Sequence, residues 1–77
     1  MNIEAIPSEV MIKSGFGYWD VTSYPIGGDF HRVGQLPMLV KLTGPIGDYG
    51  KGCNAKGITS NNRTICFDIN HTIKVES

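Results

Sequence analysis

Residues 62–76 read NRTICFDINHTIKVE, and they carry the clearest period-2 pattern in the chain. The odd positions hold the apolar side chains Ile65, Phe67, Ile69, Ile73 and Val75, whereas the even positions are mostly polar. Successive side chains of a β-strand point to opposite faces, so this pattern predicts half-buried β-structure with one apolar face. The rest of the chain must cover that face.

The pattern is interrupted at Asn70 and His71, and the connection there decides the local topology. A two-residue hairpin turn would pair Ile69 with Thr72 and mix the two faces. A three-residue connection pairs Ile69 with Ile73 and keeps one face apolar, as does a single strand bent at Asn70. These last two arrangements both satisfy the pattern, and the sequence leaves them open.

The length of 77 residues, of which 40% are hydrophobic, predicts a single domain, residues 1–77, with one modest core. So small a domain lies near the lower limit of stability, and oligomerisation or a disulfide is a natural supplement. Ten glycines and four prolines punctuate the chain. They leave no room for a helix of ordinary length after residue 14, so mostly strands and turns are expected.

Further strands are expected at residues 10–14, 30–33 and 38–43, the last of them central, with an aromatic stretch at 15–24 between the first two. Residues 44–57 hold five glycines and are expected to form a long loop or a weakly paired ribbon. Ile3 and Ile6 are expected in an edge strand or a brief helical turn. The fold class is therefore all-β: a small antiparallel barrel or a strongly twisted sheet, SH3-like or OB-like, with one short N-terminal helical turn as the rival arrangement.

The formal net charge is zero, with seven basic and seven acidic side chains and no block of like charge. Nucleic acid is therefore disfavoured as a partner, because proteins that coat nucleic acid carry an excess of Lys and Arg. A local basic patch is the alternative to scattered charges, and its members would be Arg32, Lys41, Lys51, Lys56 and Arg63. The N-terminal segment has no apolar run long enough for a signal peptide or a membrane span. We therefore expect a soluble, cytoplasmic protein without a membrane partner.

Cys53 and Cys66 are the only cysteines. A hairpin that turns within residues 58–62, with its centre between 59 and 60, would place them opposite each other. Such neighbours have the separation that a disulfide needs, whereas an intracellular location favours two ordinary thiols. The sequence leaves both states open.

Catalytic and metal-binding patterns are lacking. Neither cysteine has a second ligand at zinc-motif spacing, and His31 and His71 lie far apart in the sequence. A cysteine and a histidine could meet in space as a nucleophilic pair, but no motif in the sequence supports such a pair. We therefore expect a protein that is not an enzyme and that has no cofactor and no metal.

The aromatic side chains are the most informative feature for function, and those outside the C-terminal pattern are Phe16, Tyr18, Trp19, Tyr24, Phe30 and Tyr49. Alternation places Tyr18 and Trp19 on opposite faces of their strand, so at least one of them is expected to face solvent. Exposed Trp and Tyr are enriched in interaction surfaces. The other interpretation is that Trp19 anchors the core.

Residues 15–18, Gly-Phe-Gly-Tyr, resemble the G-F-G-F element of cold-shock domains. Phe30 and His31 lie at roughly the distance of the second aromatic motif of that family, V-F-V-H-F. The tryptophan that precedes the first motif in the family is replaced by the segment 10–13. The resemblance implies aromatics that stack on single-stranded bases.

The first functional hypothesis is a small binding protein that acts through a protein–protein interface, of the kind found among accessory or inhibitory proteins of phages and mobile elements. The alternatives are a single-stranded nucleic-acid-binding barrel and an oligomeric protein that binds a small molecule or nucleotide, and a homo-oligomer is compatible with all three. The predicted binding residues are Phe16, Tyr18, Trp19, Phe30, His31, Arg32, Tyr49 and Lys51.

Overall fold

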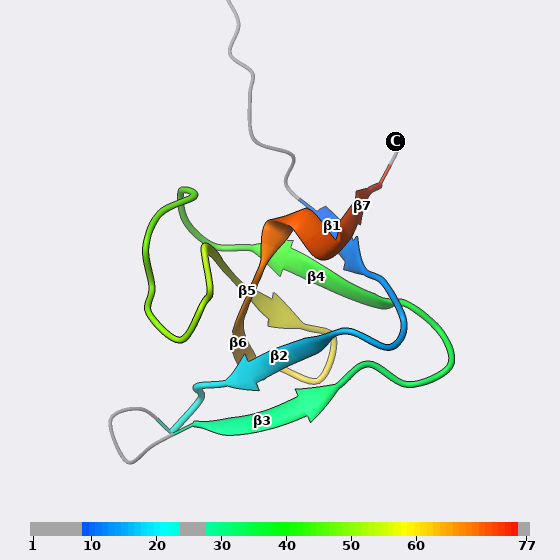
Figure 1. Cartoon of the computed structure of the whole chain (residues 1–77), viewed down its shortest axis with the longest axis horizontal. Coiled ribbons are helices and arrows are strands. Elements are labelled where there is room, and N and C mark those ends of the chain that lie inside the picture. The colour runs from blue at the N-terminus through cyan, green and yellow to red at the C-terminus, as the bar shows by residue number, and fades with distance from the viewer. Residues whose placement is uncertain (1–8, 24–27, 76–77) are drawn as a thin grey trace, which may run out of the picture.

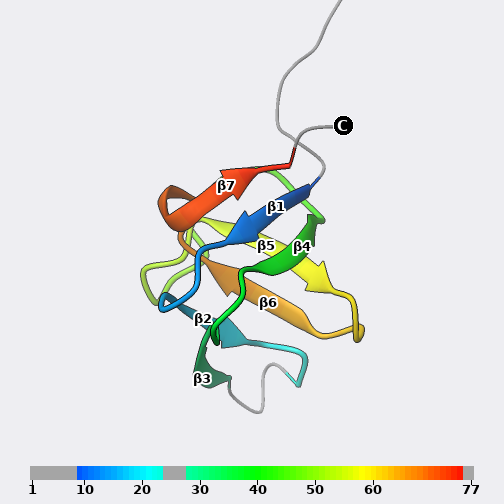
Figure 2. The ribbon, with the colours of Figure 1, turned by 90° about the vertical axis from the view of Figure 1, so that its right-hand side faces the viewer.

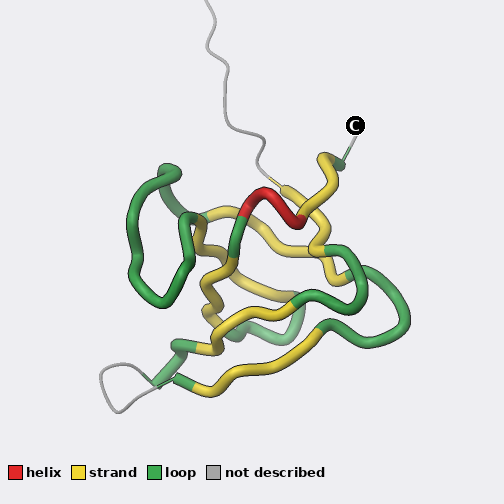
Figure 3. Tube along the Cα trace, viewed as in Figure 1, coloured by secondary structure: helices red, strands yellow, loops and turns green. Residues whose placement is uncertain are grey.

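A computed structural model describes residues 9–23 and 28–75, and within them it contains seven strands and one short 3-10 helix (Figure 1). The strands are β1 (Glu9–Ile12), β2 (Gly17–Asp20), β3 (Asp29–Arg32), β4 (Met38–Leu42), β5 (Ala55–Thr59), β6 (Thr64–Phe67) and β7 (Thr72–Lys74). The 3-10 helix η1 (Ile69–His71) lies between β6 and β7. Of the described residues, 46% lie in strands and 5% in helix, which confirms the all-β prediction (Figure 3). The predicted N-terminal segment with Ile3 and Ile6, and Tyr24, lie outside the described residues.

The strands form one antiparallel sheet in the order β3-β2-β6-β5-β4-β1-β7, which is not closed into a barrel. The hairpins β2–β3, β4–β5 and β5–β6 join strands that are consecutive in the sequence, whereas β1 pairs with β4 and β7 over long separations. The sheet is strongly twisted, with β7 and β1 at one end and the β2–β3 hairpin at the other (Figure 2). β4 lies inside the sheet, as predicted, between β5 and β1.

One face of the sheet, called the inner face below, carries the core. Its buried side chains are Val10, Ile12, Val40, Ala55, Ile65 and Phe67, with Val33 just after β3. Tyr18, Met38, Leu42 and Ile69 are partly buried and pack against this cluster. The predicted apolar face of residues 62–76 is therefore confirmed as far as Ile69, because Ile65 and Phe67 are fully buried.

The predicted continuation of that face beyond residue 69 is wrong. The chain forms neither a hairpin nor a bent strand but η1, whose first turn is capped by the Asp68 carboxylate accepting the backbone N–H of Asn70 at 3.0 Å. The 3-10 turn changes the direction of the chain, and β7 then pairs with β1 and not with β6. The alternation of buried and exposed side chains starts anew in β7, and Ile73 falls on an exposed position, where it is 45% exposed.

The register of the β5–β6 hairpin also differs from the expectation. Lys56 is the cross-strand partner of Cys66, so Cys53 lies beyond the strand end and not opposite that residue. The connection between Thr59 and Arg63 has three residues, and its last one, Asn62, has φ 66°. A three-residue hairpin loop that ends in the left-handed region is common, and it shifts the register relative to a turn centred between 59 and 60.

The glycine-rich stretch is a loop only as far as residue 54, because β5 begins at Ala55. Gly57 is part of that strand, and a Cβ atom there would lie 2.4 Å from Val40 Cγ1 and 2.6 Å from the Lys41 carbonyl oxygen. Only glycine allows β4 and β5 to approach so closely. In the part of the chain that the structure describes, no helix has the length and apolar character needed to cross a bilayer.

Candidate functional site

The outer side of the β2–β3 hairpin carries an aromatic pair. Trp19 and Phe30 are cross-strand partners, and their rings meet edge to face with centroids 5.2 Å apart. The Phe30 ring also lies across Gly17, where a Cβ atom would be only 2.1 Å from Phe30 Cζ. Glycine at position 17 therefore allows the ring to lie flat on the hairpin, and Phe30 remains 50% exposed.

Two cations flank this aromatic pair. The Arg32 guanidinium lies 5.8 Å from the centroid of the Phe30 ring, and the Lys51 ammonium lies 4.7 Å from that of Trp19. Arg32 follows Phe30 by two residues, so strand alternation places both on the same face. Lys51 arrives from the β4–β5 loop, where its φ of 56° turns the chain.

A third pair joins the same loop to the sheet. The Lys56 ammonium lies 5.0 Å from the centroid of the Tyr49 ring, and the Tyr49 hydroxyl donates a hydrogen bond to the carbonyl of Pro45. We call the combined surface the cation–aromatic face; its residues are Trp19, Phe30, Arg32, Tyr49, Lys51 and Lys56.

Strand register explains why these residues meet. Trp19 lies opposite Cys66, and Cys66 lies opposite Lys56, so one row of side chains runs from β3 through β2 and β6 to β5 on the outer face. The β4–β5 loop adds Tyr49 and Lys51 to this row. A hollow of about 300 Å³ lies between loop and sheet, and it is lined by Val21, Tyr49, Lys51, Lys56, Thr64 and Cys66.

Charge is not evenly spread over this neutral protein. Among the described residues, ion pairs join Arg63 to Asp20 at 2.9 Å and His71 to Asp68 at 3.8 Å, and neither involves a lysine or Arg32. The three cations of the cation–aromatic face therefore have no carboxylate partner within the described part of the chain. The basic patch considered from the sequence is formed in part, because Arg63 binds Asp20 near the inner face instead.

The other predicted binding residues lie elsewhere. Tyr18 and His31 are also cross-strand partners, with ring centroids 5.6 Å apart, but alternation places them on the opposite side of the hairpin from Trp19. Phe16 stacks on His71 of η1, with centroids 4.1 Å apart and planes inclined by 12°. The aromatics that carried the cold-shock resemblance are thus divided among three surroundings and do not form one platform.

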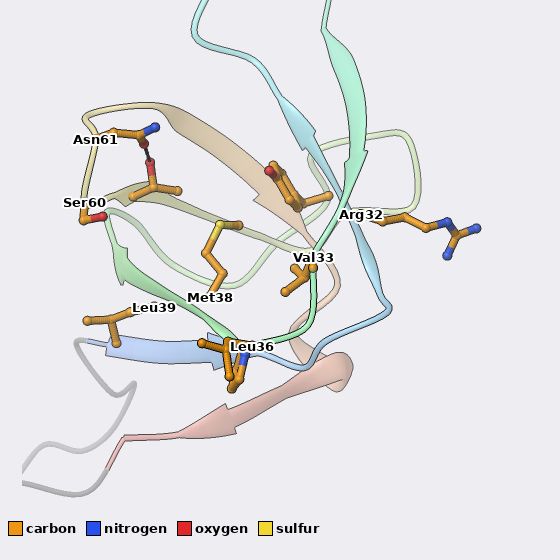
Figure 4. Close-up of a pocket in the computed structure, with 11 residues that line it drawn as sticks. Arg32, Val33, Leu36, Met38, Leu39, Ser60 and Asn61 are labelled. Carbon is orange, nitrogen blue, oxygen red and sulfur yellow. Dashed lines mark hydrogen bonds between the residues drawn. The ribbon is translucent and has the colours of Figure 1, made fainter.

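A larger hollow of about 450 Å³ lies on the inner side, between the β2–β3 hairpin and the end of the β4–β5 ribbon (Figure 4). Val33, Leu36, Met38 and Leu39 contribute to its walls, and Asn61 accepts a hydrogen bond from Thr59 at its rim. An adjoining hollow of about 240 Å³ contains the Asp20–Arg63 pair. The charges of Asp20 and Arg63 there are paired with each other.

The two cysteines are free and buried, and they lie close together. Burial raises the pKa of the Cys53 thiol to about 12, with a smaller contribution from its hydrogen bond with Cys66. A thiol that stays protonated at neutral pH is a poor nucleophile. Within residues 9–23 and 28–75, no cluster of three or more His, Cys, Asp or Glu side chains is arranged to hold a metal ion.

Lys56 is the member of the cation–aromatic face that is missing from the predicted binding residues. Residues 44–57 are rich in glycine and were expected to form a loop or a weakly paired ribbon, so Lys56 was not assigned to a strand face. Residues 55–59, AKGIT, nevertheless alternate in a way that places Lys56 and Ile58 on one face.

Comparison with protein-family models, curated proteins and solved structures found no match for this chain.

Proposed function

We propose that the protein is a non-enzymatic binding module whose partner is another protein, and that the cation–aromatic face is the interface. The observation that carries the proposal is the half-exposed Phe30 ring beside Trp19, with Arg32 and Lys51 around them. Trp, Tyr and Arg dominate the residues that contribute most to protein–protein affinity, and these residues cluster at the centre of an interface.

The cations also indicate the chemistry of the partner. Arg32, Lys51 and Lys56 lack carboxylate partners among the described residues, so an approaching acidic segment would gain ion pairs without breaking any. Electrostatic complementarity of this kind gives specificity and a faster association rate. We therefore propose a partner segment that combines Asp or Glu with an apolar side chain that packs against Phe30.

Two observations favour a protein over a single-stranded nucleic acid. Each ring of the cation–aromatic face already has a cation near it, so a base would have to displace Lys51 to stack on that side of Trp19. The formal net charge is zero, and three cations release few counterions on binding phosphates. The first effect opposes base stacking, and the second limits the salt-dependent affinity for a phosphate backbone.

The finer fold is part of the same proposal. We assign the sheet to a partly open, SH3-like barrel, because β1 and β7, the first and last described strands, pair with each other and η1 immediately precedes the last strand. The fold does not determine the function, so the proposal rests on the cation–aromatic face alone.

The experiment compares capture from a nuclease-treated lysate of the source cells by three immobilised proteins: wild type, Phe30→Ala and Leu36→Ala. Leu36 is the matched control, since it is an apolar side chain that is 79% exposed and lies outside the cation–aromatic face. A protein held by wild type and Leu36→Ala but lost by Phe30→Ala supports the proposal. Equal retention by all three, or no nuclease-resistant partner, contradicts it.

Single-stranded nucleic acid is the second candidate function, and one observation favours it: three cations alternate with three aromatic rings on the cation–aromatic face. Proteins that bind single strands combine positive charge along the backbone path with rings on which bases stack. Under this function, affinity would fall steeply as the salt concentration rises.

A further inference from the structure

The edge strand β3 has an open side. All four of its residues are exposed, and within the described part of the chain it pairs with β2 alone (Figure 1). Edge strands present a row of unpaired backbone N–H and C=O groups, to which another strand can bond.

The backbone pattern shows which groups face outward. The Val33 N–H donates to the Phe16 carbonyl at 2.8 Å, so Val33 belongs to a hydrogen-bonded pair with the neighbouring chain segment. Antiparallel ladders alternate, and residues 31 and 29 therefore direct their backbone groups toward β2 in the same way. The N–H and C=O groups of Phe30 and Arg32 point to the open edge.

We propose that β3 pairs with β3 of a second copy of this chain, antiparallel and around a two-fold axis through Phe30. A two-fold axis normal to the sheet keeps each face on its own side, so opposed residues must belong to the same face. In this register Phe30 meets Phe30, and Asp29 meets His31 twice. Each imidazole N–H can then donate to a carboxylate across the interface.

The neighbouring register is worse. If His31 met His31 instead, Asp29 would lie opposite Val33, which is only 6% exposed. A carboxylate would then face an apolar residue, and two imidazoles would face each other. The register through Phe30 avoids both problems and also places the half-exposed Phe30 rings side by side on the outer face.

Charges on edge strands normally prevent pairing between molecules. In the proposed dimer the charges of β3 favour pairing, because the two-fold arrangement places Asp29 of one copy opposite His31 of the other and not opposite a second Asp29. Within one chain, by contrast, Asp29 is the cross-strand partner of Asp20, so its charge contributes nothing favourable to that pair. The interface is short, and the association is accordingly weak and visible only at high protein concentration.

The test is sedimentation velocity over a range of protein concentrations on wild type, Asp29→Lys, His31→Glu and the double variant. Wild type is expected to form a dimer reversibly. Asp29→Lys removes the carboxylate that accepts from the imidazole, and His31→Glu brings two carboxylates together, so we expect each single variant to weaken association about tenfold or more. The double variant places opposite charges at the same positions and is expected to restore the dimer.

Thermal melts by circular dichroism show whether each variant is still folded. Asp29→Lys removes a like-charge pairing with Asp20, so the monomer is expected to stay folded. Wild type that is monomeric at every concentration, assemblies larger than a dimer, or a double variant no better than the single ones would each overturn the proposal. Rescue by the charge swap cannot arise from a change in folding alone.

Discussion

At the scale of single residues, the Asp20 carboxylate accepts three hydrogen bonds. The Thr22 hydroxyl donates to Asp20 Oδ1 at 2.6 Å and the Thr22 N–H at 3.0 Å, while Arg63 Nε donates to Oδ2 at 2.9 Å. Thr22 also accepts the backbone N–H of Thr64 at 2.8 Å. The carboxylate therefore links the end of β2 to the start of β6.

This arrangement predicts a defined acid dependence. The hydrogen bonds from Thr22, followed by those from Arg63, lower the pKa of Asp20 to about 2 from its ordinary 3.8. Because the folded-state pKa is the lower one, Asp20 stabilises the fold above about pH 4, and that contribution disappears as the pH falls toward 2. We expect Asp20→Asn to have a lower Tm at pH 7 but to lose less between pH 4 and 2 than wild type. Melts at a series of pH values measure this, and parallel curves for the two proteins would refute it.

At the scale of elements, the contact between β4 and β5 depends on a single glycine. A Cβ atom at Gly57 would collide with Val40 Cγ1 and with the Lys41 backbone, and backbone atoms cannot move aside as a flexible side chain can. Gly34 differs, because a Cβ atom there would have no heavy atom within 4 Å.

We therefore expect Gly57→Ala to destabilise the protein by about 1–3 kcal/mol, the usual effect of overpacking. Gly34→Ala is the matched control and should leave the free energy of unfolding nearly unchanged. Urea denaturation of both variants and wild type measures the difference. A Gly57→Ala protein as stable as the Gly34→Ala protein would show that β4 and β5 are not so close.

The strands and turns also differ in how well the sequence predicted them. The strand 38–43 was predicted nearly to its ends, because β4 has apolar residues on alternate positions and lies inside the sheet. The β5–β6 register and the path after Ile69 could not be predicted, since both depend on local turns. Asn62 in the left-handed region sets the first, and the Asp68 cap of η1 sets the second. The geometry of such turns depends on the residues at a few turn positions, and a period-2 pattern of apolar residues does not predict it.

At the scale of the whole molecule, composition was a poor guide to the surface. The zero net charge left open whether the cations are scattered or form a local patch; Arg32, Lys51 and Lys56 gather on the cation–aromatic face, while Arg63 is paired with Asp20. Five of the eight predicted binding residues lie on this face. Alternation alone separates Tyr18 from Trp19, but the pairing of His31 with Tyr18 depends on the register of β2 against β3, and the stacking of Phe16 on His71 depends on the path of η1.

We propose that the cation–aromatic face binds a protein and not a nucleic acid. Trp19, the only tryptophan of the chain, lies within that face, so its fluorescence reports binding there directly. The decisive measurement is a titration of poly-pyrimidine and mixed-sequence oligonucleotides into the protein at low salt. We expect no saturable change in Trp19 emission at micromolar oligonucleotide concentrations. A saturable change with a micromolar midpoint, weakened by added salt and lost in Lys51→Ala, would contradict the proposal.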